Sequence, residues 1–281
     1  MERLSLNQAT TPSWNVIEAI EACARHDLGW IGLWRGPVAE AGLEATVRQV
    51  RESGVRVSSL CRGGFFPAAT AQAREERLED NRRAVDEAAT LGTDVLVLVC
   101  GGMVGRDLAG SRRMVEDGIA TLVPYARERG VRLAIEPLHP MFAADRSVIC
   151  DLGQAFALAA RVGVPEEVGV VVDAYHVWWD PQLYAHLERG RERILGLHVD
   201  DWLAPPPDVL RGRGMMGDGC IDLHGLYAAV DAGGYDGPVE VEIFNDAVWQ
   251  RPGDEVLAEM RDRYRHHVLQ PPEGRPDGGP S

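Results

Sequence analysis

The sequence contains no lysine, because all 29 of its basic residues are arginine. Schiff-base chemistry requires a lysine amine, and a P-loop requires a lysine that binds phosphate, so both are excluded. The basic residues are also outnumbered by 43 acidic ones, which gives a net charge of −14. A field of this sign repels phosphate backbones, and we therefore expect no nucleic-acid partner.

Cysteine pairs and long apolar runs are missing as well. The five cysteines lie far apart, and no CxxC pair indicates a zinc ribbon. Their odd number and wide spacing argue against a disulfide framework and favour a reducing cytoplasm. No apolar run approaches the roughly 20 residues that span a bilayer, and the first residues lack the apolar core of a signal peptide. We expect a cytoplasmic protein that does not contact a membrane.

Short aliphatic runs alternate with longer amphipathic stretches along the chain. The run 95–99 is continuous and apolar, as expected of a strand that is buried on both faces. Eight strands are predicted in all, each followed by a helix. The first helix is expected to begin at about Ser13. The predicted strands are 4–7, 30–34, 56–60, 95–99, 132–136, 168–173, 194–198 and 238–242.

This rhythm predicts an α/β fold, a (β/α)8 TIM barrel formed by residues 1–269. A doubly wound open sheet shares the rhythm. The barrel is favoured because the strand count is eight and no glycine-rich phosphate loop follows the first strand. Residues 270–281 are rich in proline and glycine and are predicted to form a flexible tail.

Four predicted strands in the second half of the chain end in, or very close to, an ionisable side chain. These side chains are Glu136, Asp173, His198 and Glu242. In a barrel the carboxyl ends of the strands meet at one opening, so the four should converge there. Three carboxylates repel one another unless a cation neutralises them. Oxygen-rich ligation with one nitrogen suits Mn²⁺ best, with Mg²⁺, Co²⁺ or Zn²⁺ as alternatives. The sequence therefore predicts one divalent metal site.

Other polar and aromatic residues are expected around this site. His176 and His139 each follow a predicted ligand by three residues, so His176 is a candidate catalytic group and His139 a candidate substrate contact. A structural hydrogen bond is the alternative for both. Trp34 ends the second strand, where its face suits the C–H face of a sugar. The long loop after the seventh strand, a candidate lid, carries Arg211 and Arg213, and either could be the site arginine.

Five short motifs lie at the ends of the last four strands and in the loops that follow them. They are Ala134-Ile135-Glu136-Pro137, Asp173-Ala174-Tyr175-His176, His198-Val199-Asp200-Asp201, Gly217-Asp218-Gly219-Cys220-Ile221-Asp222 and the stretch 234–244. Over residues 1–268 they resemble the sugar phosphate isomerase/epimerase superfamily, the xylose-isomerase-like barrels that include ketose 3-epimerases and inosose dehydratases.

The resemblance implies the same four metal ligands, a substrate-contacting His176 and a substrate-binding arginine at Arg213. Many relatives have lysine or asparagine where this chain has Asp200. Few cations are expected to face the pocket, which argues against a phosphorylated substrate.

We predict a metal-dependent isomerase or epimerase of a keto sugar or related polyol. Glu136 and Glu242 would remove and return a proton on opposite faces of the carbon next to the carbonyl, through a metal-stabilised enediolate. The alternative on the same site is a lyase, either a dehydratase or an enzyme that cleaves a 3-keto glycoside or cyclitol by β-elimination. The expected partner is a small carbohydrate-like molecule.

Two further functional classes, a DNA-repair nuclease and a non-catalytic binding protein, are less well supported. DNA-repair nucleases that share this barrel carry extra histidine ligands after the second to fourth strands, where this chain has Trp34, Cys61 and Cys100. A metal-free binding barrel would retain no divalent metal. Homo-oligomerisation stays open, since aromatic residues expected to be exposed, such as Trp249, could belong to an interface.

Overall fold

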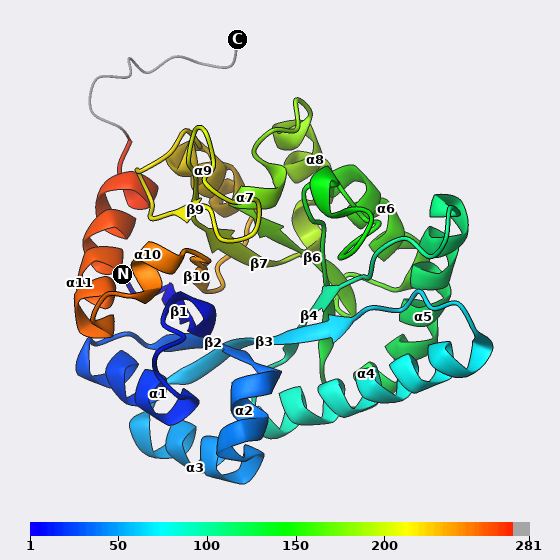
Figure 1. Cartoon of the computed structure of the whole chain (residues 1–281), viewed down its shortest axis with the longest axis horizontal. Coiled ribbons are helices and arrows are strands. Elements are labelled where there is room, and N and C mark those ends of the chain that lie inside the picture. Colours follow the sequence, from blue (N-terminus) through cyan, green and yellow to red (C-terminus); the bar gives the residue numbers. More distant parts are fainter. Residues whose placement is uncertain (272–281) are drawn as a thin grey trace.

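The computed structural model describes residues 1–271 and contains a closed barrel of eight parallel strands (Figure 1). Around the barrel the order is β1-β10-β7-β6-β5-β4-β3-β2. The predicted (β/α)8 TIM barrel is therefore confirmed. Its strands are β1 (Leu4–Asn7), β2 (Trp30–Trp34), β3 (Arg56–Gly64), β4 (Val95–Val99), β5 (Arg132–Glu136), β6 (Val168–Asp173), β7 (Ile194–Val199) and β10 (Val239–Val241). A separate antiparallel pair is formed by β8 (Asp201–Trp202) and β9 (Arg213–Gly214).

Helices cover the outside of the barrel, as Figure 1 shows. The α-helices are α1 (Val16–Arg25), α2 (Arg35–Ala41), α3 (Leu43–Ser53), α4 (Ala71–Leu91), α5 (Leu108–Glu128), α6 (Leu152–Val162), α7 (Ala174–Val177), α8 (Leu183–Gly190), α9 (Leu223–Ala232), α10 (Asp246–Trp249) and α11 (Gly253–Arg263). The 3-10 helices are η1 (Gln8–Thr10), η2 (Pro140–Phe142) and η3 (Arg191–Arg193), and η4 (Tyr264–Leu269) is a π-helix.

The alternation of side chains along each strand decides what fills the barrel. In β4, Val95 and Val97 belong to a small cluster inside the barrel, whereas Leu96 and Leu98 belong to the larger core that includes the helices. Because side chains alternate along β4, Val99 at the end of the strand also lies on the inner side of the barrel. Side chains at the inward positions of the strand ends therefore reach one opening of the barrel.

The first helix begins later than the sequence predicts. The Asn15 side chain accepts hydrogen bonds from the backbone N–H groups of Ile17 and Glu18, and the Glu18 carboxylate accepts one from the Asn15 N–H. This reciprocal capping box starts α1 at Val16. The predicted start at Ser13 is wrong because the glutamate that completes the box lies three residues after Asn15.

Two further expectations concern the C-terminal tail and the exposure of Trp249. Of the predicted tail 270–281, residues 272–281 lie outside the described residues, so the division at residue 269 stays a prediction. Trp249 is half-buried rather than exposed, and its indole N–H donates to the carbonyl oxygens of Ala9 and Ile243. The oligomeric state stays a prediction.

No helix within residues 1–271 is both long and apolar enough to cross a membrane.

Candidate active site

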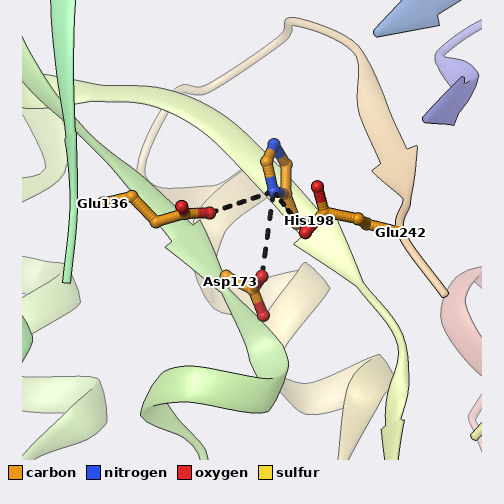
Figure 2. A group of neighbouring side chains, drawn as sticks. All are labelled: Glu136, Asp173, His198 and Glu242. Carbon is orange, nitrogen blue, oxygen red and sulfur yellow. Dashed lines mark ion pairs between the residues drawn. The ribbon is translucent and has the colours of Figure 1, made fainter. Parts of the chain in front are cut away.

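The four predicted metal ligands converge at the carboxyl-terminal opening of the barrel (Figure 2). Glu136 and Asp173 end β5 and β6, and Asp173 is directly paired with His198 on β7. Glu242 follows β10 and enters from the opposite side of His198 to Glu136. One candidate ligand atom of each residue lies within 4.8 Å of the other three, and all four side chains are buried. The structure thus brings together the set predicted from the sequence.

His198 lies at the centre of this group, and its ring nitrogen Nδ1 faces the three carboxylates. Its Nδ1 is 3.4 Å from Glu136 Oε1 and 3.8 Å from both Asp173 Oδ2 and Glu242 Oε2, but it forms no hydrogen bond. A buried polar atom without a partner is costly, and three carboxylates around an imidazole nitrogen form a donor set that suits a divalent cation. Across residues 1–271, no other group of three or more histidine, cysteine, aspartate or glutamate side chains converges in this way.

Glu240 lies behind the histidine, on the same face of β10 as Glu242. Its Oε2 is 3.6 Å from the other ring nitrogen of His198, Nε2. Its carboxylate accepts hydrogen bonds from the Asn7 amide at 2.8 Å and from the Ser58 and Ser59 hydroxyls at 2.7 Å. A fixed carboxylate behind a ligand histidine orients the ring. Sequence analysis missed Glu240, although its position two residues before Glu242 was a signal that the two side chains share one face.

The guanidinium of Arg213 lies among buried carboxyl groups. Its Nη1 donates to Asp173 Oδ2 at 3.0 Å, to Asp200 Oδ2 at 2.6 Å and to Glu242 Oε2 at 2.9 Å. Arg213 itself is buried. Positive charge at this point offsets the repulsion among the carboxylates. Arg211, the other candidate, is exposed and pairs with Asp246 at 3.2 Å, so the structure brings Arg213 and not Arg211 to the site.

The loop after β7 is fixed in a way that explains the position of Arg213. Strand β9, which begins with Arg213, pairs with β8, and the Asn245 amide donates to the Arg213 carbonyl oxygen at 2.9 Å. The Asp201 carboxylate also organises this loop by accepting hydrogen bonds from the backbone N–H groups of Trp202, Gly217, Gly219 and Ile221. The His-x-x-Asp motif therefore ends in a residue that shapes the loop.

Burial and neighbouring charges separate the pKa values of the carboxyl groups. Burial raises the pKa of Glu242 to about 7, and it raises the pKa of Asp200 well above its usual range. Burial also acts on Asp173, but Arg213 and the adjacent histidines lower the pKa of that carboxyl well below its usual range. Asp173 is thus ionised near neutral pH, whereas Glu242 can gain or lose a proton there.

His176 lines the cavity above the cluster, with its proton position fixed from behind. The His139 backbone N–H donates to His176 Nδ1 at 3.2 Å, which favours a proton on Nε2 of the neutral ring. Burial lowers the pKa of His176 to about 3, which keeps the ring neutral. Its Nε2 lies 3.2 Å from Arg213 Nη2. A neutral imidazole accepts at only one nitrogen, so one of these two contacts lacks an acceptor, and an acceptor oxygen of a bound molecule beside Nε2 would supply it.

The structure does not bring the His139 ring to the cavity wall. This ring stacks on Trp202 with centroids 5.3 Å apart, meets Trp179 edge to face, and accepts a hydrogen bond from the Met141 N–H. The contribution of His139 to the site geometry is its backbone N–H. Its predicted contact with substrate stays a prediction.

A cavity of about 130 Å³ opens over the cluster. Trp34 lies in its wall, where the indole N–H donates to Asn7 Oδ1 at 2.8 Å and the ring meets Phe244 edge to face. Arg62 and Arg146 line the same cavity. The expectation that few cations face the pocket is therefore wrong. Arg62 could have been found, because it directly follows Cys61 at the predicted end of a strand.

Comparison with known protein families decides where this barrel belongs. The family model described as "Xylose isomerase-like TIM barrel" matches residues 17–266. The chain belongs to this family. The resemblance drawn from the five motifs is thereby confirmed.

Named relatives of the chain are enzymes, and both predicted reaction types, epimerisation and dehydration, occur among them. It is 32% identical over 213 residues to the 3-dehydroshikimate dehydratase of Pseudomonas aeruginosa, an alignment that covers 69% of this chain and 32% of that protein. The chain thus spans about a third of the length of this relative. It is 26% identical over 228 residues to the L-ribulose-5-phosphate 3-epimerase UlaE of Escherichia coli K12, with 78% of this chain and 74% of that protein covered.

Solved structures of similar proteins share the architecture over almost the whole chain. Protein SMc04130 from Sinorhizobium meliloti 1021 is 49% identical, with a TM-score of 0.93 and coverage of 96% of this chain and 99% of that one. A crystal structure of the IolI protein with a bound zinc atom is 20% identical, with a TM-score of 0.82 and coverage of 93% and 96%. At that identity the likeness to IolI shows the fold alone.

Proposed function

We propose that this protein is a divalent-metal-dependent isomerase or epimerase of a keto sugar or related polyol. The observation that carries the proposal is the buried Nδ1 of His198, which forms no hydrogen bond and faces three buried carboxylates at the opening of the barrel. Two of those carboxylates, Glu136 and Glu242, also line the cavity. The arrangement offers one place for a cation and two groups that can exchange protons with a bound molecule.

The residues that would hold the cation are Glu136, Asp173, His198 and Glu242. Their three carboxylates and one imidazole suit Mn²⁺, with Mg²⁺, Co²⁺ and Zn²⁺ as alternatives. The zinc atom bound to IolI, which has the same fold, is consistent with a metal in this barrel. When bound, such a cation supplies a Lewis acid that polarises a substrate carbonyl oxygen.

The protein's own side chains carry out the proton transfers. Glu136 and Glu242 come from opposite sides, so one can remove the proton from the carbon next to the carbonyl while the other returns one to the opposite face. His176 Nε2 and Arg213 donate hydrogen bonds to substrate oxygens, and Trp34 offers its ring to the C–H face of the sugar.

A lyase reaction on the same site is the second candidate. It is favoured by the 32% identity to a dehydratase. In this reaction the glutamate that removed the proton would give it to a leaving group on the neighbouring carbon, and no proton would return to the first carbon. The neutral His176, which lines the cavity, would donate a hydrogen bond to that group. We also propose a cytoplasmic location, which fits the five free cysteines.

The test is hydrogen exchange in D₂O. Candidate keto sugars are incubated with the Mn²⁺-loaded protein, and NMR follows deuterium at the carbon next to the carbonyl. Glu242→Gln should slow exchange by about 10³-fold while the fold stays intact, because general acid–base groups contribute effects of this size. Glu255→Gln, on the exposed face of α11, is the matched control and should leave exchange unchanged.

The products distinguish the two candidate reactions, since an epimerised sugar indicates an epimerase and an unsaturated product indicates a lyase. Exchange that persists in Glu242→Gln at the wild-type rate would remove Glu242 from the acid–base pair. A metal-loaded wild-type protein that exchanges no keto sugar and forms no unsaturated product would contradict the proposed function.

A further inference from the structure

Two arginine side chains lie on the side of the cavity that faces the metal-ligand histidine. Arg62 is on β3, which is diametrically opposite β7 in the strand order of the barrel. Arg146 follows η2, and its carbonyl oxygen accepts a hydrogen bond from the N–H of Gly101, just beyond β4, at 2.8 Å. Both side chains line the cavity. The cavity therefore has an acidic end, formed by β5, β6, β7 and β10, and a basic end near β3 and β4.

The guanidinium groups at the basic end have unused donors. Arg62 forms no hydrogen bond or ion pair through its side chain with any described residue, and it stacks over the Phe65 ring at 3.9 Å. Arg146 has one ion pair, with the adjacent Asp145 at 3.8 Å, and its guanidinium lies 5.7 Å from the Phe142 ring centre. Aromatic rings therefore cover the faces of these groups, which leaves N–H edges available to a ligand.

Two like charges line one small cavity and repel each other. Burial, together with the nearby Arg146, lowers the pKa of Arg62. Arg213, in the same cavity, differs because its guanidinium is already paired with three carboxylates. An anion at the basic end would be attracted by Arg62 and Arg146, and the carboxylate cluster would repel it from the other end.

We propose that Arg62 and Arg146 form an anion subsite that binds a carboxylate or phosphate group at the end of the substrate remote from the reacting carbon. The inference rests on the proposed function for the other end of the cavity. Guanidinium groups bind both kinds of oxyanion through paired N–H···O hydrogen bonds. The substrate class is thereby narrowed to keto sugars or cyclitols with one negatively charged substituent. The separation of charge also fixes the direction in which the substrate enters.

Three ketoses that differ only at one carbon test the subsite. D-fructose, D-fructose 6-phosphate and D-fructuronate share the ketone end and carry a hydroxyl, a phosphate and a carboxylate at the other end. Calorimetry measures their binding to the Mn²⁺-loaded wild type, to Arg62→Gln, to Arg146→Gln and to the double variant. Arg113→Gln is the matched control, since Arg113 is exposed on α5 with one ion pair at 3.9 Å.

At least one charged ketose should bind the wild type about tenfold more tightly than fructose, because charge-assisted pairs are the strong hydrogen bonds. Each single variant should reduce this preference by about fivefold, and neither should change the affinity for fructose. The charged ketose that shows the larger preference identifies the anion as carboxylate or phosphate. Equal affinity for all three ketoses, or a double variant that behaves like Arg113→Gln, would overturn the subsite.

A second measurement separates this proposal from the proposed function. Inorganic phosphate is titrated into the metal-free proteins and followed by ³¹P NMR, with thermal unfolding as the check that each variant is folded. Phosphate should bind the double variant about tenfold more weakly than the wild type or Arg113→Gln. Unchanged binding in the double variant, or none in the wild type, would overturn the anion subsite. Intact phosphate binding with no ketose bound at all would instead contradict the proposed function.

Discussion

The two halves of the barrel contribute different chemistry to one cavity. Strands β5, β6, β7 and β10 place Glu136, Asp173, His198 and Glu242 at the opening, whereas β2, β3 and β4 place Trp34, Cys61, Arg62 and Val99 there. Negative charge is therefore concentrated on one wall, where the proposed function places a cation and proton transfer. The other wall is apolar and basic, and it suits the part of a substrate that does not react.

The largest effect is expected from removing the positive charge of the acidic wall. Arg213→Met leaves the buried carboxyl groups of Asp173, Asp200 and Glu242 without their guanidinium partner. The free energy of unfolding of the metal-free protein should fall by about 3 kcal/mol, as for other broken buried ion pairs. Mn²⁺ should restore part of this loss. Denaturant unfolding is the measurement, and the exposed Arg211→Met is the control, with a change below about 0.5 kcal/mol. Equal losses in both variants would contradict the role of Arg213.

Metal affinity should increase with pH. The pKa of Glu242 is raised to about 7, so below that pH the folded protein holds a proton that a cation must displace. Each displaced proton weakens binding about tenfold per pH unit below the pKa. His198, whose pKa is also raised, adds a second proton. Calorimetric titration with Mn²⁺ across pH 5.5 to 8 gives the number of protons that are released when the metal binds. Glu242→Gln should release one proton fewer than the wild type. An affinity independent of pH would show that the carboxyl does not take part.

A smaller effect is expected on the apolar wall. Trp34→Ala should raise the KM for the sugar that exchanges fastest by about fivefold and change kcat by less than about twofold, since the indole contacts a part that does not react. Trp34→Phe keeps an aromatic ring, and its KM should lie between those of the wild type and Trp34→Ala. Steady-state kinetics provide both constants. A loss of kcat with an unchanged KM would place Trp34 in the chemical step and remove the distinction between the walls.

The barrel could be predicted because its strands are short aliphatic runs with clear ends. The predicted 30–34 and 95–99 match β2 and β4 residue for residue. β3 was predicted to end at Leu60, but it continues to Gly64, where Gly63 and Gly64 pair with Leu98 and Val99. Arginine and two glycines indicate a loop when considered alone. Only the neighbouring strand makes this stretch extend the sheet.

The convergence of the four candidate metal ligands could be predicted because it follows from topology, whereas the rest of the site depends on loops. The choice between Arg211 and Arg213 is made by the short β8–β9 pair, which the sequence pattern does not indicate. The direction of the His139 ring is set by packing against Trp202 and Trp179. Arg146 approaches the cavity because its loop is hydrogen-bonded beyond β4. None of these contacts has a periodic signal in the sequence.

The most direct test of the account is equilibrium binding of Mn²⁺ to the purified protein and to Glu136→Gln, with Glu255→Gln as the control. The wild type and the control should each bind one Mn²⁺ per chain, because the four side chains form one site. The Glu136→Gln protein should bind about 100-fold more weakly, since loss of an outer partner alone costs 10- to about 100-fold. A full equivalent of Mn²⁺ bound to Glu136→Gln with wild-type affinity would contradict the central claim that these strand ends hold one metal ion.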